Sequence, residues 1–140
     1  MDEIYVWAQR MADEQINGIT KKTIGKSWED RELFVLILDE LTGVENPPKI
    51  FLDCGIHARE WISHAFCQYF VDQLARPNSK FGHLRNGIEW HIMPVVNPDG
   101  YAWSWSDDRF WRKNRNPNTG SVNTFSLIFR LFWFQVININ

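Results

Sequence analysis

The chain has 140 residues, of which 44% are hydrophobic, 23% charged and 15% aromatic. These values are typical of one globular domain and exclude a disordered or fibrous polymer. The formal net charge is −2, from 17 acidic side chains against 15 lysines and arginines, so no strong field attracts nucleic acid or a membrane surface. We therefore expect neither of them as a partner.

The two ends of the chain differ in character. The N-terminus is acidic and lacks the basic start and apolar stretch of a secretory signal. The last acidic residue is Asp108, and between residues 122 and 140 twelve of nineteen residues are Val, Ile, Leu, Phe or Trp. This apolar segment is too short and too interrupted to span a bilayer, and its β-prone composition favours aggregation.

Apolar periodicity and turn residues predict alternating helices and strands. In chain order we expect a helix over 4–15, strands over 20–24, 33–38 and 49–54, a helix over 61–74, a strand over 90–96 and a turn at 97–100. The strands at 33–38 and 49–54 are nearly continuous apolar runs, which indicates burial on both faces. The pattern favours an α/β sheet with segments 54–61 and 97–100 at the carboxyl ends of its strands, where ligands bind.

His57 and Glu60 lie three residues apart between an expected strand and an expected helix. Imidazole nitrogen and carboxylate oxygen are both good zinc ligands, and a catalytic zinc commonly takes three protein ligands and a water. A His-x-x-Glu pair alone is more often a surface pair or a charge at a helix start. Its place after a buried strand, with Arg59 available to hold a substrate anion, favours the metal site.

Three ordered blocks resemble the digestive and regulatory zinc metallocarboxypeptidases, nearer the B type than the A type. They are Phe51-Leu-Asp-Cys-Gly-Ile-His-Ala-Arg-Glu-Trp-Ile-Ser-His-Ala-Phe-Cys67, Pro94-Val-Val-Asn-Pro-Asp-Gly-Tyr101 and Arg109-Phe-Trp-Arg-Lys-Asn-Arg115. Residues 24–33 also resemble an early hairpin of the family. The resemblance implies an α/β fold with an incomplete, mixed, largely parallel sheet flanked by helices, and removal of C-terminal amino acids from peptides and proteins by a zinc-bound water.

The resemblance also implies a role for each matching side chain. His57 and Glu60 would be two ligands of one zinc ion, and Arg59 and Arg109 would bind the substrate. Arg112 would polarise the scissile carbonyl and act catalytically, because an always-charged planar donor stabilises the negative charge that hydrolysis builds on oxygen. The alternative for Arg112 is a solvated basic patch.

Cys54 and Cys67 flank the expected ligands. Two buried free thiols are the alternative for an intracellular protein. Cysteines at matching positions of B-type members form a disulfide, so the resemblance implies a bridge and an extracellular, secreted protein. Closing a loop of this size contributes roughly 3 kcal/mol in the chain-entropy model and stiffens the turn that carries the ligands.

The resemblance covers residues from about 2 to 121. We interpret residues 1–121 as the N-terminal part of a catalytic domain and residues 122–140 as an apolar tail foreign to the family, from translated intron, a frame change or an alternative isoform. The family's third ligand histidine, carboxylate clamp and general-base glutamate match nothing here. We therefore expect negligible hydrolysis by this truncated chain, which would aggregate where a complete member is a monomer. The alternative is a catalytically dead domain that retains zinc or peptide binding.

His64 offers a local alternative for the third ligand. His57, Glu60 and His64 would share one face if a single helix contained them all. The glycine at position 55 argues against a helix that starts so early.

Tryptophans 103, 105 and 111 lie among basic side chains, which could indicate a surface for single-stranded nucleic acid. The slightly negative net charge and the lack of an RNA-binding motif favour core packing instead. Asp99 is interpreted as a turn residue without a catalytic role.

Overall fold

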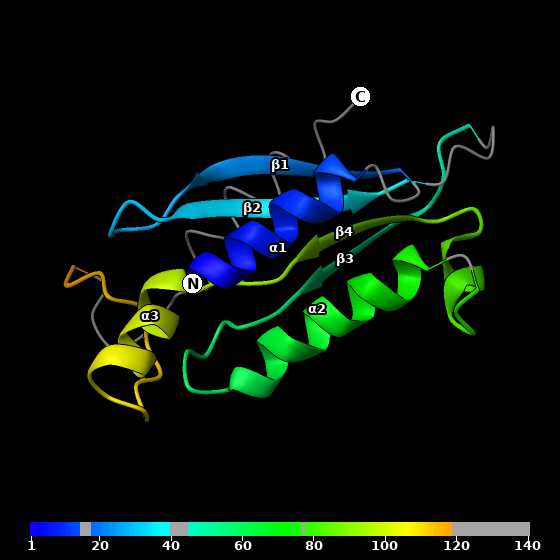
Figure 1. Cartoon of the computed structure of the whole chain (residues 1–140). Coiled ribbons are helices and arrows are strands. Elements are labelled where there is room, and N and C mark those ends of the chain that lie inside the picture. The colour runs from blue at the N-terminus through cyan, green and yellow to red at the C-terminus, as the bar shows by residue number, and fades with distance from the viewer. Residues whose placement is uncertain (15–17, 40–44, 77, 119–140) are drawn as a thin grey trace.

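The computed structural model describes residues 1–14, 18–39, 45–76 and 78–118 (Figure 1). The elements in chain order are α1 (Asp2–Asp13), β1 (Ile19–Lys26), β2 (Glu32–Leu38), β3 (Lys49–Asp53), α2 (Trp61–Ala75), the 3₁₀ helix η1 (Gly82–Arg85), β4 (Glu89–Met93) and α3 (Pro98–Ser106). All six expected helices and strands are confirmed, with ends shifted by a few residues. The expected boundary at 121 and the expected tail at 122–140 lie outside the described residues.

Four strands form one sheet in the order β1-β2-β4-β3. The β1–β2 and β2–β4 pairs are antiparallel, and the β3–β4 pair is parallel. The sheet is mixed, but the expectation of a largely parallel sheet is wrong for these strands. Parallel neighbours need a long crossover, usually through a helix, and α2 supplies one only between β3 and β4, whereas a tight turn at 27–31 joins β1 to β2.

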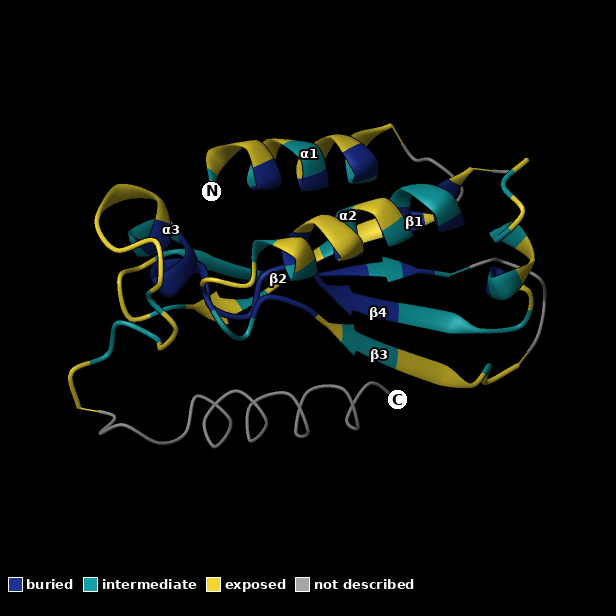
Figure 2. Ribbon diagram, turned by 90° about the horizontal axis from the view of Figure 1, so that it is seen from below, coloured by how far each residue is buried: buried dark blue, intermediate teal, exposed yellow. Residues whose placement is uncertain are grey.

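Helices α1 and α2 lie on the same face of the sheet (Figures 1 and 2). Met11 of α1, Leu36 of β2 and Val71 of α2 belong to one buried cluster between these layers. Val35 of β2 points the other way and packs with Met93. The apolar run of β2 is therefore buried on both faces, as the sequence predicts.

The strand β3 differs from its prediction as a buried strand. Its residues Lys49, Ile50 and Asp53 are exposed. The physical reason is its position, because among the described strands β3 pairs with β4 alone and forms an edge of the sheet. Within the described residues, no helix has the length and apolarity that a membrane crossing requires.

Helix α3 begins where the sequence indicates a turn. The side-chain oxygen of Asn97 accepts a hydrogen bond from the Gly100 N–H at 2.9 Å, and Pro98 is the first helical residue. Asparagine as N-cap followed by proline is a signal for a helix start, so this pattern serves helices as well as turns.

Asp99, in the first turn of α3, holds the β1–β2 turn. Its buried carboxylate accepts hydrogen bonds from Ser27 Oγ at 2.6 Å, from the Glu29 N–H at 3.0 Å and from the Arg31 guanidinium at 2.8 Å. The interpretation of Asp99 as a simple turn residue therefore missed a structural role. One carboxylate joins two segments about 70 residues apart in the sequence.

We expect Asp99→Asn to lower the free energy of unfolding of the chain by about 2 kcal/mol, because the amide keeps only one acceptor oxygen and loses the charge opposite Arg31. Its NH2 group would face either the Ser27 and Arg31 donors or the Glu29 N–H. Urea unfolding followed by tryptophan fluorescence measures this change. Asp30→Asn is the matched control, since Asp30 is exposed in the same turn and bonds only weakly to Lys26 at 3.4 Å. Equal effects of both substitutions would contradict the role of Asp99.

Candidate functional site

Two chain segments meet at the carboxyl ends of β3 and β4, as the sequence predicts. The Cys54 N–H donates to the Met93 carbonyl at 3.0 Å, and the Val96 N–H donates to the Cys54 carbonyl at 2.9 Å. The Asn97 N–H then donates to the Gly55 carbonyl at 3.2 Å. These bonds continue the ladder beyond the strands and bring the segment before α2 against the start of α3.

The turn between β3 and α2 places the expected ligands together. His57 Nδ1 and Glu60 Oε1 lie 2.9 Å apart, and the Glu60 N–H donates to the His57 carbonyl at 3.1 Å. Both side chains are partly exposed, at 30% and 49%. Zinc bonds to nitrogen and to carboxylate oxygen are about 2.0–2.2 Å long, so one ion can contact both atoms. The donor set therefore fits two positions of a zinc site.

A local third ligand is not present in this part of the fold. Among the described residues, no group of three or more His, Cys, Asp or Glu side chains could hold a metal ion. His64 does not share a helix with both expected ligands, because α2 begins only after Glu60. Its ring is 1% exposed and stacks on Tyr101 with 4.1 Å between ring centroids.

The segment after α3 brings Arg112 to the same place. Its guanidinium Nη2 lies 3.4 Å from His57 Nδ1, although the two residues are 55 positions apart. The Ala58 N–H donates to the Arg112 carbonyl at 3.1 Å, which fixes the backbone of the arginine beside the ligand turn. A permanent positive charge thus stands next to the candidate metal ligands.

Arg109 and Arg59 lie along one edge of this site. The Arg109 guanidinium stacks on the Trp61 ring at 3.7 Å and donates to the Arg59 carbonyl at 3.0 Å. Trp61 in turn stacks on Trp105 at 3.9 Å, so the arginine caps a column of two indoles. Both arginines are exposed, and each leaves charge available to a ligand.

Trp103 carries a similar stack, with the Arg115 guanidinium 3.7 Å from its ring centroid. The same arginine pairs with Glu29 at 3.3 Å. This indole face is therefore covered by the chain's own arginine, which agrees with a packing role for the tryptophan.

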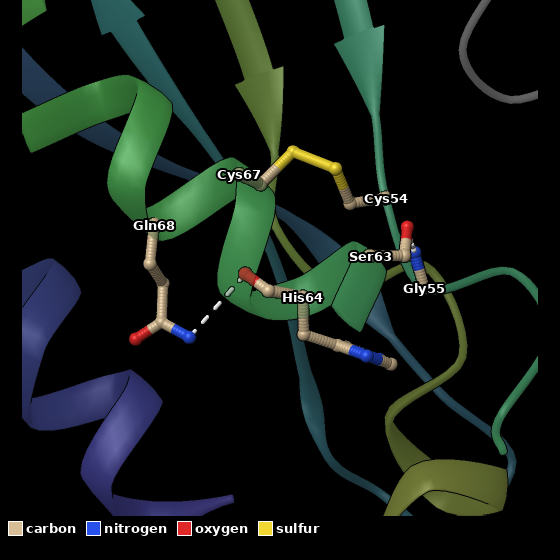
Figure 3. Close-up of a disulfide and its surroundings, with 6 residues drawn as sticks. All are labelled: Cys54, Gly55, Ser63, His64, Cys67 and Gln68. Carbon is tan, nitrogen blue, oxygen red and sulfur yellow. Dashed lines mark hydrogen bonds between the residues drawn. A yellow bond between two sulfur atoms is a disulfide. The ribbon is translucent and has the colours of Figure 1, made fainter. Parts of the chain in front are cut away.

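Side chains of the first turns of α2 contact Cys54 and Gly55, just before the ligand turn (Figure 3). The expected disulfide between Cys54 and Cys67 is confirmed. The Gly55 N–H donates to Ser63 Oγ at 3.0 Å, and the His64 ring lies against Gly55, whose φ is +70°. A Cβ on this glycine would overlap the imidazole. Bridge, hydrogen bond and ring contact together fix the backbone just before the candidate ligands.

Burial lowers the pKa of His64 to about 4. Neither ring nitrogen has a hydrogen-bond partner of normal geometry. The nearby carbonyls of Glu60 and Trp61 and the Glu60 charge favour the protonated form, but less than burial opposes it. The ring is therefore neutral at pH 7 and acts as a packing element of the turn.

The sequence model of the zinc carboxypeptidase family matches residues 4–138. This chain belongs to the zinc carboxypeptidase family. It is 41% identical over 128 residues to mast cell carboxypeptidase A of Rattus norvegicus, covering 88% of this chain and 31% of that protein. It is 40% identical over 123 residues to carboxypeptidase B of the same species, covering 86% and 29%. The chain thus spans about a third of the length of these curated relatives.

A solved structure agrees with this membership. Bovine thrombin-activatable fibrinolysis inhibitor, in complex with a tick carboxypeptidase inhibitor, is similar with a TM-score of 0.71 and 40% identity, over 88% of this chain and 38% of that chain. The family match continues past residue 121 into the part of the chain that the structure does not describe. The expected boundary there stays a prediction.

Proposed function

We propose that this chain carries two zinc ligands and the oxyanion-stabilising arginine of a zinc carboxypeptidase, which removes C-terminal amino acids from peptides and proteins. The observation that carries the proposal is the position of His57 Nδ1, which lies 2.9 Å from Glu60 Oε1 and 3.4 Å from Arg112 Nη2. When bound, zinc supplies a Lewis acid and lowers the pKa of a water ligand. His57 and Glu60 would hold the ion.

Arg112 acts on the substrate in this proposal. Its planar cation stabilises the negative charge that develops on the scissile carbonyl oxygen. Because the Ala58 N–H holds the Arg112 backbone, the charge is positioned before the substrate arrives, which favours the transition state. Arg59 and Arg109 bind the peptide, with Arg109 fixed on the Trp61 ring so that little side-chain entropy is lost on binding.

The natural partners in this proposal are peptide and protein C-termini, and the B-type likeness favours basic terminal residues. The disulfide supports an extracellular, secreted protein, because such bridges persist in oxidising compartments. We propose a monomer for the complete enzyme.

The alternative function is a domain that binds zinc or peptides without catalysis, which is favoured by the two-ligand set of the described residues.

Calorimetric titration of the 140-residue chain with Zn²⁺ tests the metal assignment. We expect His57→Ala and Glu60→Gln each to weaken binding by at least about tenfold, because each removes a ligand. His83→Ala is the matched control, since His83 is exposed on η1 away from the β3–α2 turn. Unchanged affinity in the first two variants would contradict the assignment.

Peptides ending in Arg, Lys or Phe distinguish the two functions. We expect this chain alone to hydrolyse these peptides negligibly but still to bind them. We expect the binding to depend on Arg112. Hydrolysis that a chelator abolishes would instead assign full activity to the chain. If the chain neither binds nor hydrolyses these peptides, both functions are overturned.

A further inference from the structure

Asn97 is buried, at 2% exposure, where β4 leads into α3. Its side-chain amide makes three hydrogen bonds to three different segments. The Oδ1 atom accepts from the Gly100 N–H at 2.9 Å, and Nδ2 donates to the carbonyls of Ile56 at 3.3 Å and Lys113 at 2.9 Å. An amide suits this place because it is neutral and combines an acceptor with two donors.

The two carbonyls are next to the residues that matter for the site. Ile56 directly precedes His57, and Lys113 directly follows Arg112. The segment that carries Arg112 has no regular secondary structure, so its position depends on individual hydrogen bonds, among them the two that involve the Lys113 and Arg112 carbonyls. One amide group therefore ties the metal-ligand turn to the arginine segment.

The surroundings leave the amide little freedom. A Cβ at Gly100 would overlap both the Asn97 amide and the Lys113 carbonyl, so these groups pack closely around the helix start. The Ala58 N–H makes a separate bond to the Arg112 carbonyl, and Ala58 is fully buried. This amide proton therefore reports whether the two segments stay together.

We propose that Asn97 is a positioning residue that holds His57 and Arg112 in place relative to one another, through its hydrogen bonds to the Ile56 and Lys113 carbonyls. The proposal rests on the proposed function for its link to zinc. The link between the two segments, here called the tie, consists of the hydrogen bonds from Asn97 Nδ2 to the Ile56 and Lys113 carbonyls and does not depend on zinc. Asn97 touches neither metal nor substrate and acts through the backbone of the two segments.

Amide hydrogen exchange on the full chain, measured by NMR, tests the tie. Asn97→Ser keeps a neutral helix cap but loses both N–H donors, and Asn97→Asp keeps the shape and the acceptor. We expect exchange of the Ala58 amide to accelerate about tenfold in both variants, while the Gly100 amide keeps its protection. Uniform acceleration of all amides would show a merely structural role and overturn the proposal, as would an unchanged Ala58 rate.

Two further readouts keep the test decisive. In the unsubstituted chain the Asn97 side-chain protons should exchange more slowly than those of the exposed Asn118, and equal rates would overturn the proposal even if both variants fail to fold.

Titration with Zn²⁺ alone is the second readout. The affinity for Zn²⁺ should be about tenfold weaker in Asn97→Ser than in the unsubstituted chain, the size of effect typical of residues that support ligands. Asn116→Ser is the matched control. If the unsubstituted chain binds no Zn²⁺, the proposed function fails while the exchange result still decides the tie.

Discussion

Replacing Gly55 by alanine is expected to lower the free energy of unfolding of the chain by about 2–5 kcal/mol. The φ of +70° strains any residue with a Cβ by roughly 1–2 kcal/mol. The added carbon also overlaps the buried His64 ring, and such overpacking typically costs about 1–3 kcal/mol. Chemical denaturation with the disulfide intact measures the loss.

Gly87→Ala separates the two causes. Gly87 has nearly the same φ, +68°, but no atom within 4 Å of a built Cβ, so only the backbone strain of about 1–2 kcal/mol applies. Removing the ring in a Gly55→Ala/His64→Ala double variant should bring the effect of the alanine down to the same level. If Gly55→Ala costs no more than Gly87→Ala, the ring contact does not shape the turn.

Acid is expected to destabilise the chain through His64, by about 3 kcal/mol between pH 7.5 and pH 4. The folded state holds the pKa of His64 at about 4, below the ordinary value of 6.5, so the unfolded chain binds the proton more tightly. The contribution of the neutral ring is therefore fully present above pH 6.5 and is lost as the pH falls toward 4. Unfolding free energies across this range, with chelator present, give the slope.

His64→Leu isolates this group, because leucine is of similar size and does not titrate. The free energy of unfolding of the unsubstituted chain minus that of His64→Leu should fall by roughly 2–3 kcal/mol as the pH falls from 6.5 to 4. Glu32, whose pKa is lowered by hydrogen bonds to Lys21 and Thr23 despite its burial, adds its own loss at lower pH in both proteins. A parallel pH dependence of the two proteins would show that His64 is not responsible.

Most of the described fold follows from local patterns in the sequence. Apolar spacing placed α1, α2 and all four strands, and the continuous run of β2 indicated its burial on both faces. The largely parallel sheet that the resemblance implied was wrong for the described strands, and periodicity could not correct it because it carries no information on pairing. The resemblance of residues 24–33 to an early hairpin did indicate the antiparallel β1–β2 pair. Helix α3 was missed because Asp99 and Gly100 are poor helix formers, while the cap at Asn97 looks like a turn.

The candidate site likewise has a part that local sequence predicts and a part that depends on tertiary packing. His57 and Glu60 lie in one short segment, so their meeting follows from the chain itself. The approach of Arg112 across 55 residues and the contact of His64 with Gly55 depend on tertiary packing. The bonds of Asn97 to Ile56 and Lys113 depend on it too, and residue types alone do not indicate them.

X-ray absorption at the zinc edge of the metal-loaded chain tests the central claim most directly. We predict imidazole scattering at about 2.0–2.1 Å together with carboxylate oxygen at about 2.0–2.2 Å. We predict no sulfur neighbour, because both cysteines are bridged. The imidazole signal should disappear in His57→Ala and persist in His83→Ala. A spectrum that His57→Ala leaves unchanged would contradict the assignment of this turn as the metal site.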